Sequence, residues 1–297
     1  MSITPIYVNK RLSDDDRRAR IFEGGIFLYP APPESLKMTD WARELIDQAF
    51  GATGDVRRAH YALDVHEFVE RAGPLKSTFT NSAQTKRICQ ELIASLGCDP
   101  EATYFDLPRL RVAPPGAFLT SGVSYSYKPH RDTWYAHPPQ LVNYWVPVFD
   151  SEPSHVMSMF LEYFRRPLEN TSAGWDYDEW VKHARFAAAS NIAQETRRHP
   201  VPSGALAETA DVRIVQNSGD LMLFSTCQLH ATAPNELDTI RYSYDLRTLN
   251  LEDLRLGRGP ANVDAQATGS TLRDFLRVSD LKPLDPATLP QANALRP

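Results

Sequence analysis

The chain of 297 residues carries a net charge of −5 and a pI near 5.9, and 42% of its residues are hydrophobic. This charge argues against nucleic acid as the main partner, and no window reaches the roughly 18 consecutive apolar residues of a membrane span. Three scattered cysteines, Cys89, Cys98 and Cys227, form neither a zinc pattern nor a disulfide framework. The N-terminus shows no secretory signal. We therefore expect a cytoplasmic protein, monomeric or homodimeric, that acts on a small molecule.

The N-terminal part, about residues 1–104, predicts one strand and two helices that support the remaining core. Residues 22–30 read as an early strand, whereas Thr39 and Gly51 read as the start and the end of a helix. A second helix is predicted over about 82–96 and ends at Gly97. The helix between Thr39 and Gly51 is predicted from one apolar stripe, formed by Trp41, Leu45, Ile46 and Phe50.

Short strands separated by turn residues dominate the part from about 105 to 250. The strands are predicted over 109–112, 140–149, 219–226 and 240–249, and the last alternates with a strict period of two. A helical insertion is expected at about 155–200, and an extension at 251–297. We predict a single domain, 1–297, that is mainly β with flanking helices and has a double-stranded β-helix (jelly roll, cupin-like) core.

Three residues with metal-binding side chains, His130, Asp132 and His230, stand at the ends of these expected strands. Two imidazoles and one carboxylate on one face of an octahedron leave three positions open, as in non-haem Fe(II) oxygenases. A His-x-Asp pair also arises by chance, and a surface turn is the simplest alternative. The setting beside strands, which position ligands rigidly, favours a metal site.

These segments resemble the Fe(II)/2-oxoglutarate-dependent oxygenase superfamily, specifically its phytanoyl-CoA dioxygenase-like branch, over roughly residues 105–250. The resemblance implies that His130, Asp132 and His230 are catalytic and bind Fe(II), with 2-oxoglutarate and O2 as co-substrates. It also implies that Arg241 pairs with the far carboxylate of 2-oxoglutarate. The matching features are His130-x-Asp132, Tyr135, the Trp145-Val-Pro-Val strand, Gly219-Asp220, His230-x-Thr232 and Arg241-x-Ser243.

Further residues are assigned to the co-substrate site by the same resemblance or by their place on a strand. Thr232 and Trp145 line this pocket in the family, and Asn143 is assigned with them. Arg offers a carboxylate a planar pair of permanently charged N–H donors. Ser243, two residues beyond Arg241, points the same way and can donate a further hydrogen bond.

The strand over 240–249 has two faces, and its alternation does not decide which one points inward. One face is apolar enough to pack on helices or to fill a barrel. The metal-site argument chooses the other face, on which Asp245 and Arg247 are expected to form no more than an ion pair. Arg247→Ala is therefore expected to weaken 2-oxoglutarate binding much less than Arg241→Ala. The apolar face carries Ile240, Tyr242, Tyr244 and Leu246.

Candidates for substrate contact are Trp134, Tyr135, Tyr127 and Arg109. Lys128 and Arg131 would suit an acidic small molecule, although cations beside a turn are usually solvated. His137 is expected to be a loop residue, and the alternatives are a substrate contact or a residue that supports a metal ligand. The remaining histidines are interpreted as ordinary helix or loop residues: His60, His66, His155, His183 and His199.

The resemblance implies an oxygenase that hydroxylates or otherwise oxidises a C–H bond of a small-molecule metabolite or natural-product intermediate. Succinate and CO2 would be the co-products. Asp132 argues against the related halogenases, which have a small residue in place of the acid. One alternative is a cupin-like metal enzyme, an isomerase or co-substrate-independent dioxygenase, against which Arg241-x-Ser243 speaks. Another is a non-catalytic jelly-roll binding protein, against which the complete ligand set speaks.

Overall fold

A large sheet runs through the computed structural model, which describes residues 4–185, 187–192, 194–204, 206 and 211–285. Neighbouring strands of this sheet are antiparallel except for the parallel pair β1–β2. The shorter strand β4 (Arg109–Ala113) pairs with β10 beside β3. The order of the other strands is β1 (Ile6–Val8), β2 (Ile26–Tyr29), β8 (Leu221–Ser225), β5 (Leu141–Pro147), β10 (Arg241–Asn250), β3 (Thr103–Asp106) and β11 (Phe275–Arg277).

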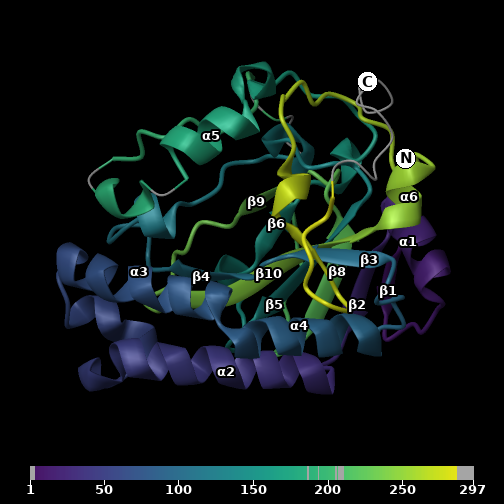
Figure 1. Ribbon diagram of the computed structural model, residues 1–297. Coiled ribbons are helices and arrows are strands. Elements are labelled where there is room, and N and C mark those ends of the chain that lie inside the picture. Colours follow the sequence, from purple (N-terminus) through teal and green to yellow (C-terminus); the bar gives the residue numbers. More distant parts are fainter. Residues whose placement is uncertain (1–3, 186, 193, 205, 207–210, 286–297) are drawn as a thin grey trace.

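A second, smaller sheet faces the inner side of the large one (Figure 1). It consists of β7 (Val212–Arg213), β6 (Met157–Met159) and β9 (His230–Thr232), all antiparallel. His130, outside the named strands, extends it, because His130 and His230 exchange two backbone hydrogen bonds of 2.9 Å. Two sheets enclosing a cavity form the expected jelly-roll core.

Three helices cover the outer face of the large sheet: α2 (Pro33–Phe50), α3 (Val65–Asn81) and α4 (Ala83–Ser95). The predicted apolar stripe of α2 lies against this face, with Leu45, Ile46 and Phe50 buried. α2 ends at Gly51 as expected, but it begins at Pro33 and not at Thr39. Proline is favoured at the first helical position because its fixed φ is already suitable and no N–H is needed there.

Helices α1 (Asp14–Phe22) and α3 are not among the predicted elements. Asp64 and Glu67 form a capping box at the start of α3, which satisfies two otherwise unpaired backbone N–H groups. Pro74 lies inside α3 and removes one backbone donor. The helix continues through it because Phe68, Leu75 and Phe79 are buried in the core on both sides of the proline.

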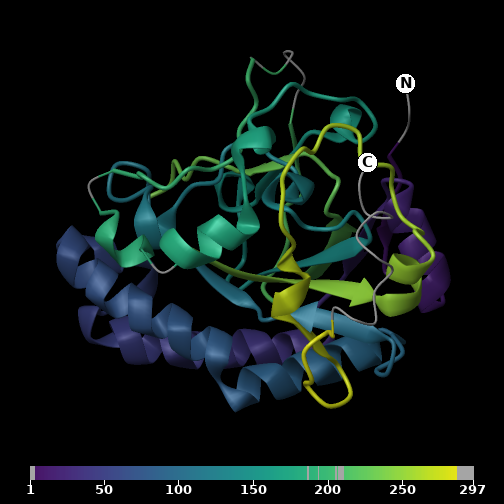
Figure 2. The ribbon, with the colours of Figure 1, turned by 45° about the horizontal axis from the view of Figure 1, so that its top comes forward.

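The expectation of a helical insertion at about 155–200 is confirmed only for α5 (Tyr177–His183), which begins after the cap residue Asp176, and is wrong for the rest of the stretch. The other described residues of this stretch form β6, several 3-10 turns and loops. Its aromatic residues pack on one another above the cavity and not along a helical stripe, as with the rings of Trp175 and Trp180, 4.7 Å apart. Figure 2 shows α5 and its flanking loops on the opposite side of the large sheet from α2.

The loop after α5 is fixed to the barrel at Gly122. The Gly122 N–H donates to Glu195 Oε2 and its carbonyl accepts from Arg197 Nη2, both at 3.0 Å. Gly122 has a φ of +58°, and a Cβ there would lie 2.5 Å from the carbonyl oxygen of Ala188. Only glycine therefore allows this close approach.

The C-terminal part continues from β10 into α6 (Leu251–Arg255) and returns to the large sheet as β11. Arg18 of α1 forms a 2.5 Å ion pair with Asp253, which joins the two ends of the described chain. No helix among the described residues is both long enough and apolar enough to cross a membrane.

Candidate active site

The structure brings His130, Asp132 and His230 together in the buried interior between the two sheets. One ligand atom from each lies within 4.8 Å of the others. The Nε2 atoms of His130 and His230 lie 3.5 and 3.9 Å from Asp132 Oδ1. This spacing allows all three atoms to bind a single metal ion.

Backbone carbonyls fix the orientation of both imidazoles. His130 Nδ1 lies 2.7 Å from the carbonyl oxygen of Lys128, and His230 Nδ1 lies 2.9 Å from that of Gln228. A carbonyl only accepts hydrogen bonds, so each Nδ1 carries the proton and each Nε2 presents its lone pair. Burial and the neighbouring His130 lower the pKa of His230 to about 4, which favours the neutral, metal-binding form.

The second oxygen of Asp132 is held by two side chains from the large sheet. Asn143 Nδ2 and Arg247 Nε donate to Oδ2 at 2.8 and 3.0 Å. Burial alone would raise the pKa of Asp132, but the charge of Arg247 and the contact with His130 outweigh it and hold that pKa well below the usual range. Oδ1, which faces the histidines, is therefore negatively charged and able to bind a metal ion.

Arg247 differs most from its sequence-based interpretation. It bonds Asp132 and also contacts Asp106, with 3.1 Å between Nη1 and Oδ2. These carboxylates, together with Asp245, overcome the effect of burial and raise the pKa of Arg247. The expected ion pair with Asp245 is present, with 3.8 Å between Nη1 and Oδ2. Arg247 does more than form this pair, because β3, far away in the sequence, brings Asp106 to the same guanidinium.

The polar face of β10 points toward the cavity, as the metal-site argument requires. Residues directly opposite one another in paired strands lie on the same face of a sheet. Asp245 is paired with Arg109 of β4 and with Trp145 of β5, and Arg247 is paired with Asn143. The alternate residues, including Tyr244, belong to the core beneath the helices.

Arg241 is buried, lines the cavity and has no carboxylate within 4 Å among the described residues. Its Nε has no hydrogen-bond partner, and Nη1 makes a long contact of 3.4 Å with the carbonyl of Val156. Burial and the charge of Arg111 lower its pKa to about 10. The Oγ of Ser243, two residues on, is also unpartnered, although this side chain is fully buried and does not line the cavity.

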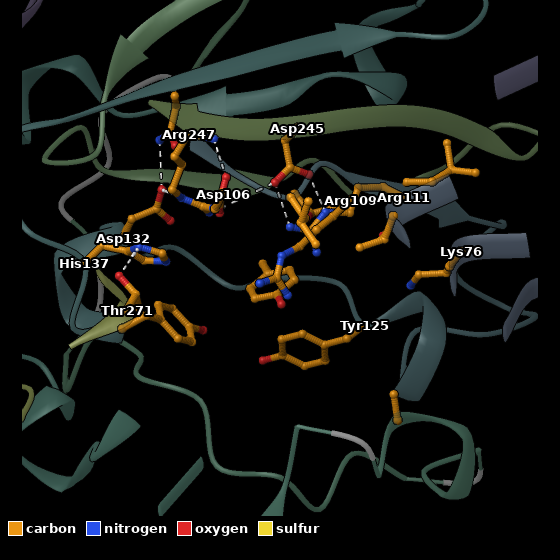
Figure 3. Close-up of a pocket in the computed structure, with 18 of the residues that line it drawn as sticks. Lys76, Asp106, Arg109, Arg111, Tyr125, Asp132, His137, Asp245, Arg247 and Thr271 are labelled. Atoms are coloured by element: carbon orange, nitrogen blue, oxygen red, sulfur yellow. Dashed lines mark hydrogen bonds and ion pairs between the residues drawn. The ribbon is translucent and has the colours of Figure 1, made fainter. Parts of the chain in front are cut away.

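The cavity around these residues has a volume of about 580 Å³, which is within the usual range for small-molecule sites. Figure 3 shows its charged wall, with Arg247 and Asp132 near one end and Lys76 at the other. Of the residues assigned to the co-substrate, Asn143, Trp145 and Thr232 line it.

The four candidate substrate residues divide into two groups. Tyr127, Tyr135 and Arg109 line the cavity. Trp134 does not, because its fully buried ring packs in a separate cluster and its Nε1 donates to Asp264 at 2.7 Å. Trp134 therefore supports the turn that carries Asp132 and does not face a substrate.

The two cations beside the ligand turn do not reach the cavity. Arg131 is almost completely buried on the far side of the turn, where it pairs with Asp264 at 3.1 Å and donates to backbone carbonyls. Lys128 is exposed. The suggestion that these two residues attract an acidic substrate is therefore not supported.

Two further histidines line the cavity. His137 lies in a loop, as expected, and its Nδ1 lies 2.9 Å from Thr271 Oγ1. His199 stacks on Tyr125 with 4.0 Å between ring centroids. Both histidines lack any partner spacing, so only the folded chain brings them to the site.

No family model matches the chain, and no curated protein shows significant sequence similarity to it. Solved structures with a similar overall arrangement include EvdO2 from Micromonospora carbonacea var. aurantiaca complexed with 2-oxoglutarate, at 17% identity and a TM-score of 0.46, covering 81% of this chain and 93% of that one. The apo form of the non-haem monooxygenase ThoJ is 17% identical with a TM-score of 0.42, and the match covers 78% of this chain and 77% of ThoJ. SnoN, an α-ketoglutarate-dependent epimerase from nogalamycin biosynthesis, is 12% identical with a TM-score of 0.39, and the match covers 89% of this chain and 98% of SnoN. Likenesses this distant assign no function.

Proposed function

We propose that the protein is a non-haem Fe(II)- and 2-oxoglutarate-dependent oxygenase. It would hydroxylate, or otherwise oxidise, a C–H bond of a small-molecule metabolite or natural-product intermediate. One observation carries this proposal: a single cavity holds both a three-donor metal group and a buried arginine that has no carboxylate partner among the described residues.

The donor set suits a divalent first-row metal with exchangeable positions. Two neutral imidazoles and one carboxylate leave the ion with a net charge of +1 and, in an octahedral arrangement, three free positions. His130 and His230 are already in the required tautomer, and Asp132 is already charged. The protein therefore needs little rearrangement to bind the ion.

The cation at the start of β10 suits the far carboxylate of 2-oxoglutarate. A buried guanidinium without a counter-ion is costly, and a carboxylate that accepts two of its N–H groups removes that cost. Arg241 is such a group. Thr232, the last residue of β9, also lines the cavity. Ser243, two residues on from Arg241, is fully buried and does not line the cavity, so it is not assigned a contact with the co-substrate.

When bound, iron would supply the oxidation, with O2 consumed and succinate and CO2 released. The residues of the chain would bind the metal and the co-substrate, orient them and shield them from water. Arg241 would fix the direction of the co-substrate, while Asn143 and Arg247 keep Oδ1 of Asp132 directed at the metal position. Tyr127, Tyr135 and Trp175 form apolar walls that limit access of water.

A cupin-like metal enzyme that does not use 2-oxoglutarate is the second candidate, because the three donors alone fit it equally well. The buried, unpaired state of Arg241 favours the first. Membership of the phytanoyl-CoA dioxygenase-like branch, a cytoplasmic location and a monomeric or homodimeric state stay predictions.

The first experiment measures binding of Fe(II), and then of 2-oxoglutarate, to the purified protein by calorimetry without oxygen. Succinate formation is measured after oxygen is admitted. His130→Ala should abolish Fe(II) binding and succinate formation while the fold is kept, since the residue lines an open cavity. His183→Ala is the matched control, because that histidine is exposed and lies on α5.

Equal Fe(II) affinity in His130→Ala and wild type would refute the metal site. Fe(II) binding without any 2-oxoglutarate binding would instead favour the cupin-like alternative.

A further inference from the structure

The cavity contains more cationic than anionic side chains. Seven cations and four carboxylates line it, so it has a surplus of positive charge before any metal binds. The cations are Lys76, Arg109, Arg111, Arg185, Arg197, Arg241 and Arg247, and the carboxylates are Asp106, Asp132, Asp245 and Asp274.

Four of these cations have carboxylate partners. Arg111 forms a two-pronged contact with Asp245 at 2.5 and 2.9 Å. The other three contacts are Arg185 with Asp274 at 2.9 Å, Arg197 with Glu195 at 2.6 Å, and Arg247 with Asp106 and Asp132. These pairs belong to the fold and need no further anion.

Lys76 and Arg109 are left without a carboxylate partner among the described residues, once Arg241 is assigned to 2-oxoglutarate. Lys76 of α3 donates to the carbonyl of Val123, and Arg109 of β4 makes no hydrogen bond or ion pair with any described side chain. Figure 3 shows Arg109 in the middle of the charged wall, with Lys76 at the end of the cavity away from His137. A group that binds there would meet two cations from different elements.

The surroundings of Lys76 indicate how unbalanced this charge is. Burial, together with the positive charges of Arg111 and Arg109, lowers the pKa of Lys76 to about 7, and the nearby Asp245 offsets only part of this effect. A bound anion would relieve this repulsion, because an opposite charge within a few ångströms favours the charged form.

Aromatic rings form the wall that faces these cations. Tyr125 and Trp180 surround His199, at centroid distances of 4.0 and 5.3 Å. Tyr127 lies beneath the guanidinium of Arg111 at 5.3 Å. Flat faces of this kind suit a ring or another unsaturated body.

We propose that the substrate is an anionic small molecule whose carboxylate or phosphate group binds to Lys76 and Arg109. This inference rests on the proposed function, since it reserves Arg241 for the co-substrate. It differs from a general attraction of anions, because it assigns the substrate's acid group to two residues that the metal and 2-oxoglutarate do not use.

The test measures binding and does not require turnover. Benzoate, phenyl phosphate and uncharged benzamide are titrated calorimetrically into the metal-free protein, and then into the protein loaded with Ni(II) and 2-oxoglutarate. The two acids distinguish a carboxylate site from a phosphate site. At least one acid should bind ten times more tightly than benzamide, as expected for charge-assisted hydrogen bonds.

Arg109→Gln and Lys76→Gln should each weaken binding of that acid about tenfold or more. Arg87→Gln is the matched control, because Arg87 is exposed on α4 and outside the cavity. Circular dichroism shows whether each variant is folded, and Arg109→Lys, which keeps the charge, should recover part of the affinity.

The inference is overturned if neither acid binds better than benzamide, or if both glutamine variants bind the acids as the wild type does. A tenfold loss of 2-oxoglutarate affinity in Arg109→Gln would also overturn it, since Arg109 would then serve the co-substrate. By contrast, if the wild type binds no 2-oxoglutarate but prefers the acids in an Arg109-dependent way, the proposed function fails and the anion site stands.

Discussion

Two arginines on the same face of β10 stand in opposite electrostatic conditions. Arg247 contacts the carboxylates of Asp106 and Asp132, and these raise its pKa. Arg241 is equally enclosed but has no carboxylate partner in the described part of the chain, and its pKa falls to about 10. A drop from the usual 12.5 corresponds to a free-energy cost on the order of 3 kcal/mol.

The two arginines differ in whether the protein itself neutralises their charge. A cation that the protein neutralises itself adds order, because it holds Asp132 in one orientation. A cation that stays unpaired lowers the stability of the empty protein and gains that energy back when an anion binds. Under the proposed function, the strand would therefore carry a positioning residue, Arg247, and a co-substrate-binding residue, Arg241.

Arg247→Ala should show the largest effect. It leaves Asp106 and Asp132 buried without their main counter-charge, which typically lowers the free energy of unfolding by about 3–5 kcal/mol. Fe(II) affinity should fall about 10–100-fold, because Asp132 loses an orienting bond. Urea unfolding of the metal-free protein and metal titration measure both quantities. Unchanged stability would abolish the contrast between the two arginines.

Arg241→Ala should weaken 2-oxoglutarate binding by roughly thirty-fold or more, since truncating one partner of a buried charge pair costs about 2–5 kcal/mol. Fe(II) binding should persist, because Arg241 donates nothing to the metal. Arg241→Lys should lie between the two, since it keeps the charge but loses the planar fork.

Arg241→Met, which replaces the unpaired cation by an apolar chain, should not lower stability in the absence of ligands. An unchanged 2-oxoglutarate affinity in Arg241→Ala would show that another residue binds the co-substrate.

Asn143→Ala should have a smaller effect than Arg247→Ala, because it removes a neutral donor from the same oxygen of Asp132. A hydrogen bond to a charged group contributes about 1.5–3 kcal/mol. The lower end of that range corresponds to roughly a tenfold loss of Fe(II) affinity, which is the loss we expect. Asn217→Ala is the control, since Asn217 is exposed. A larger loss than in Arg247→Ala would reverse the assigned roles.

His199 should give the smallest effect, seen in the pH dependence of stability. Burial, reinforced by Arg197, lowers its pKa to about 4. Between pH 6.5 and 4 the unfolded chain binds a proton that the folded chain does not, so stability is complete above pH 6.5 and falls as the pH decreases. His199 should contribute about 1 kcal/mol to the loss between pH 7 and 5.5.

Urea unfolding of the metal-free wild type and of His199→Phe at both pH values measures that contribution as a difference. His183→Phe, at an exposed position on α5, should match the wild type. Identical pH dependence in His199→Phe and wild type would contradict the low pKa.

Local patterns predicted the parts of the site that depend on local structure. The period of two over 240–249 and the apolar run after Gly219 gave strands β10 and β8, and strand ends then placed the three metal donors. The inward face of β10 followed from the metal argument alone. The structure agrees because register, once fixed, determines the face of every residue in a strand.

Contacts between distant segments could not be predicted in this way. Arg247 is held by Asp106, and Lys76 reaches the cavity from a helix that the sequence did not reveal because Gly73-Pro74 resembles a break. The stretch around Trp175 and Trp180 was predicted to be helical throughout, but only α5 is a helix, because the rings on either side of its start pack over a cavity and not on a single helical face. Such positions depend on partners many residues away.

The attachment of the 188–199 loop at Gly122 has an evolutionary consequence. His130 and His230 belong to the smaller sheet and Asp132 to the turn that follows His130. Part of the cavity wall, at Ala188, Arg197 and His199, belongs instead to a loop that is held by contacts of Gly122 with Glu195 and Arg197. As long as these three residues persist, the intervening positions can drift without disturbing the donors. New substrates can thus be acquired by divergence of one loop while the reaction chemistry is inherited unchanged.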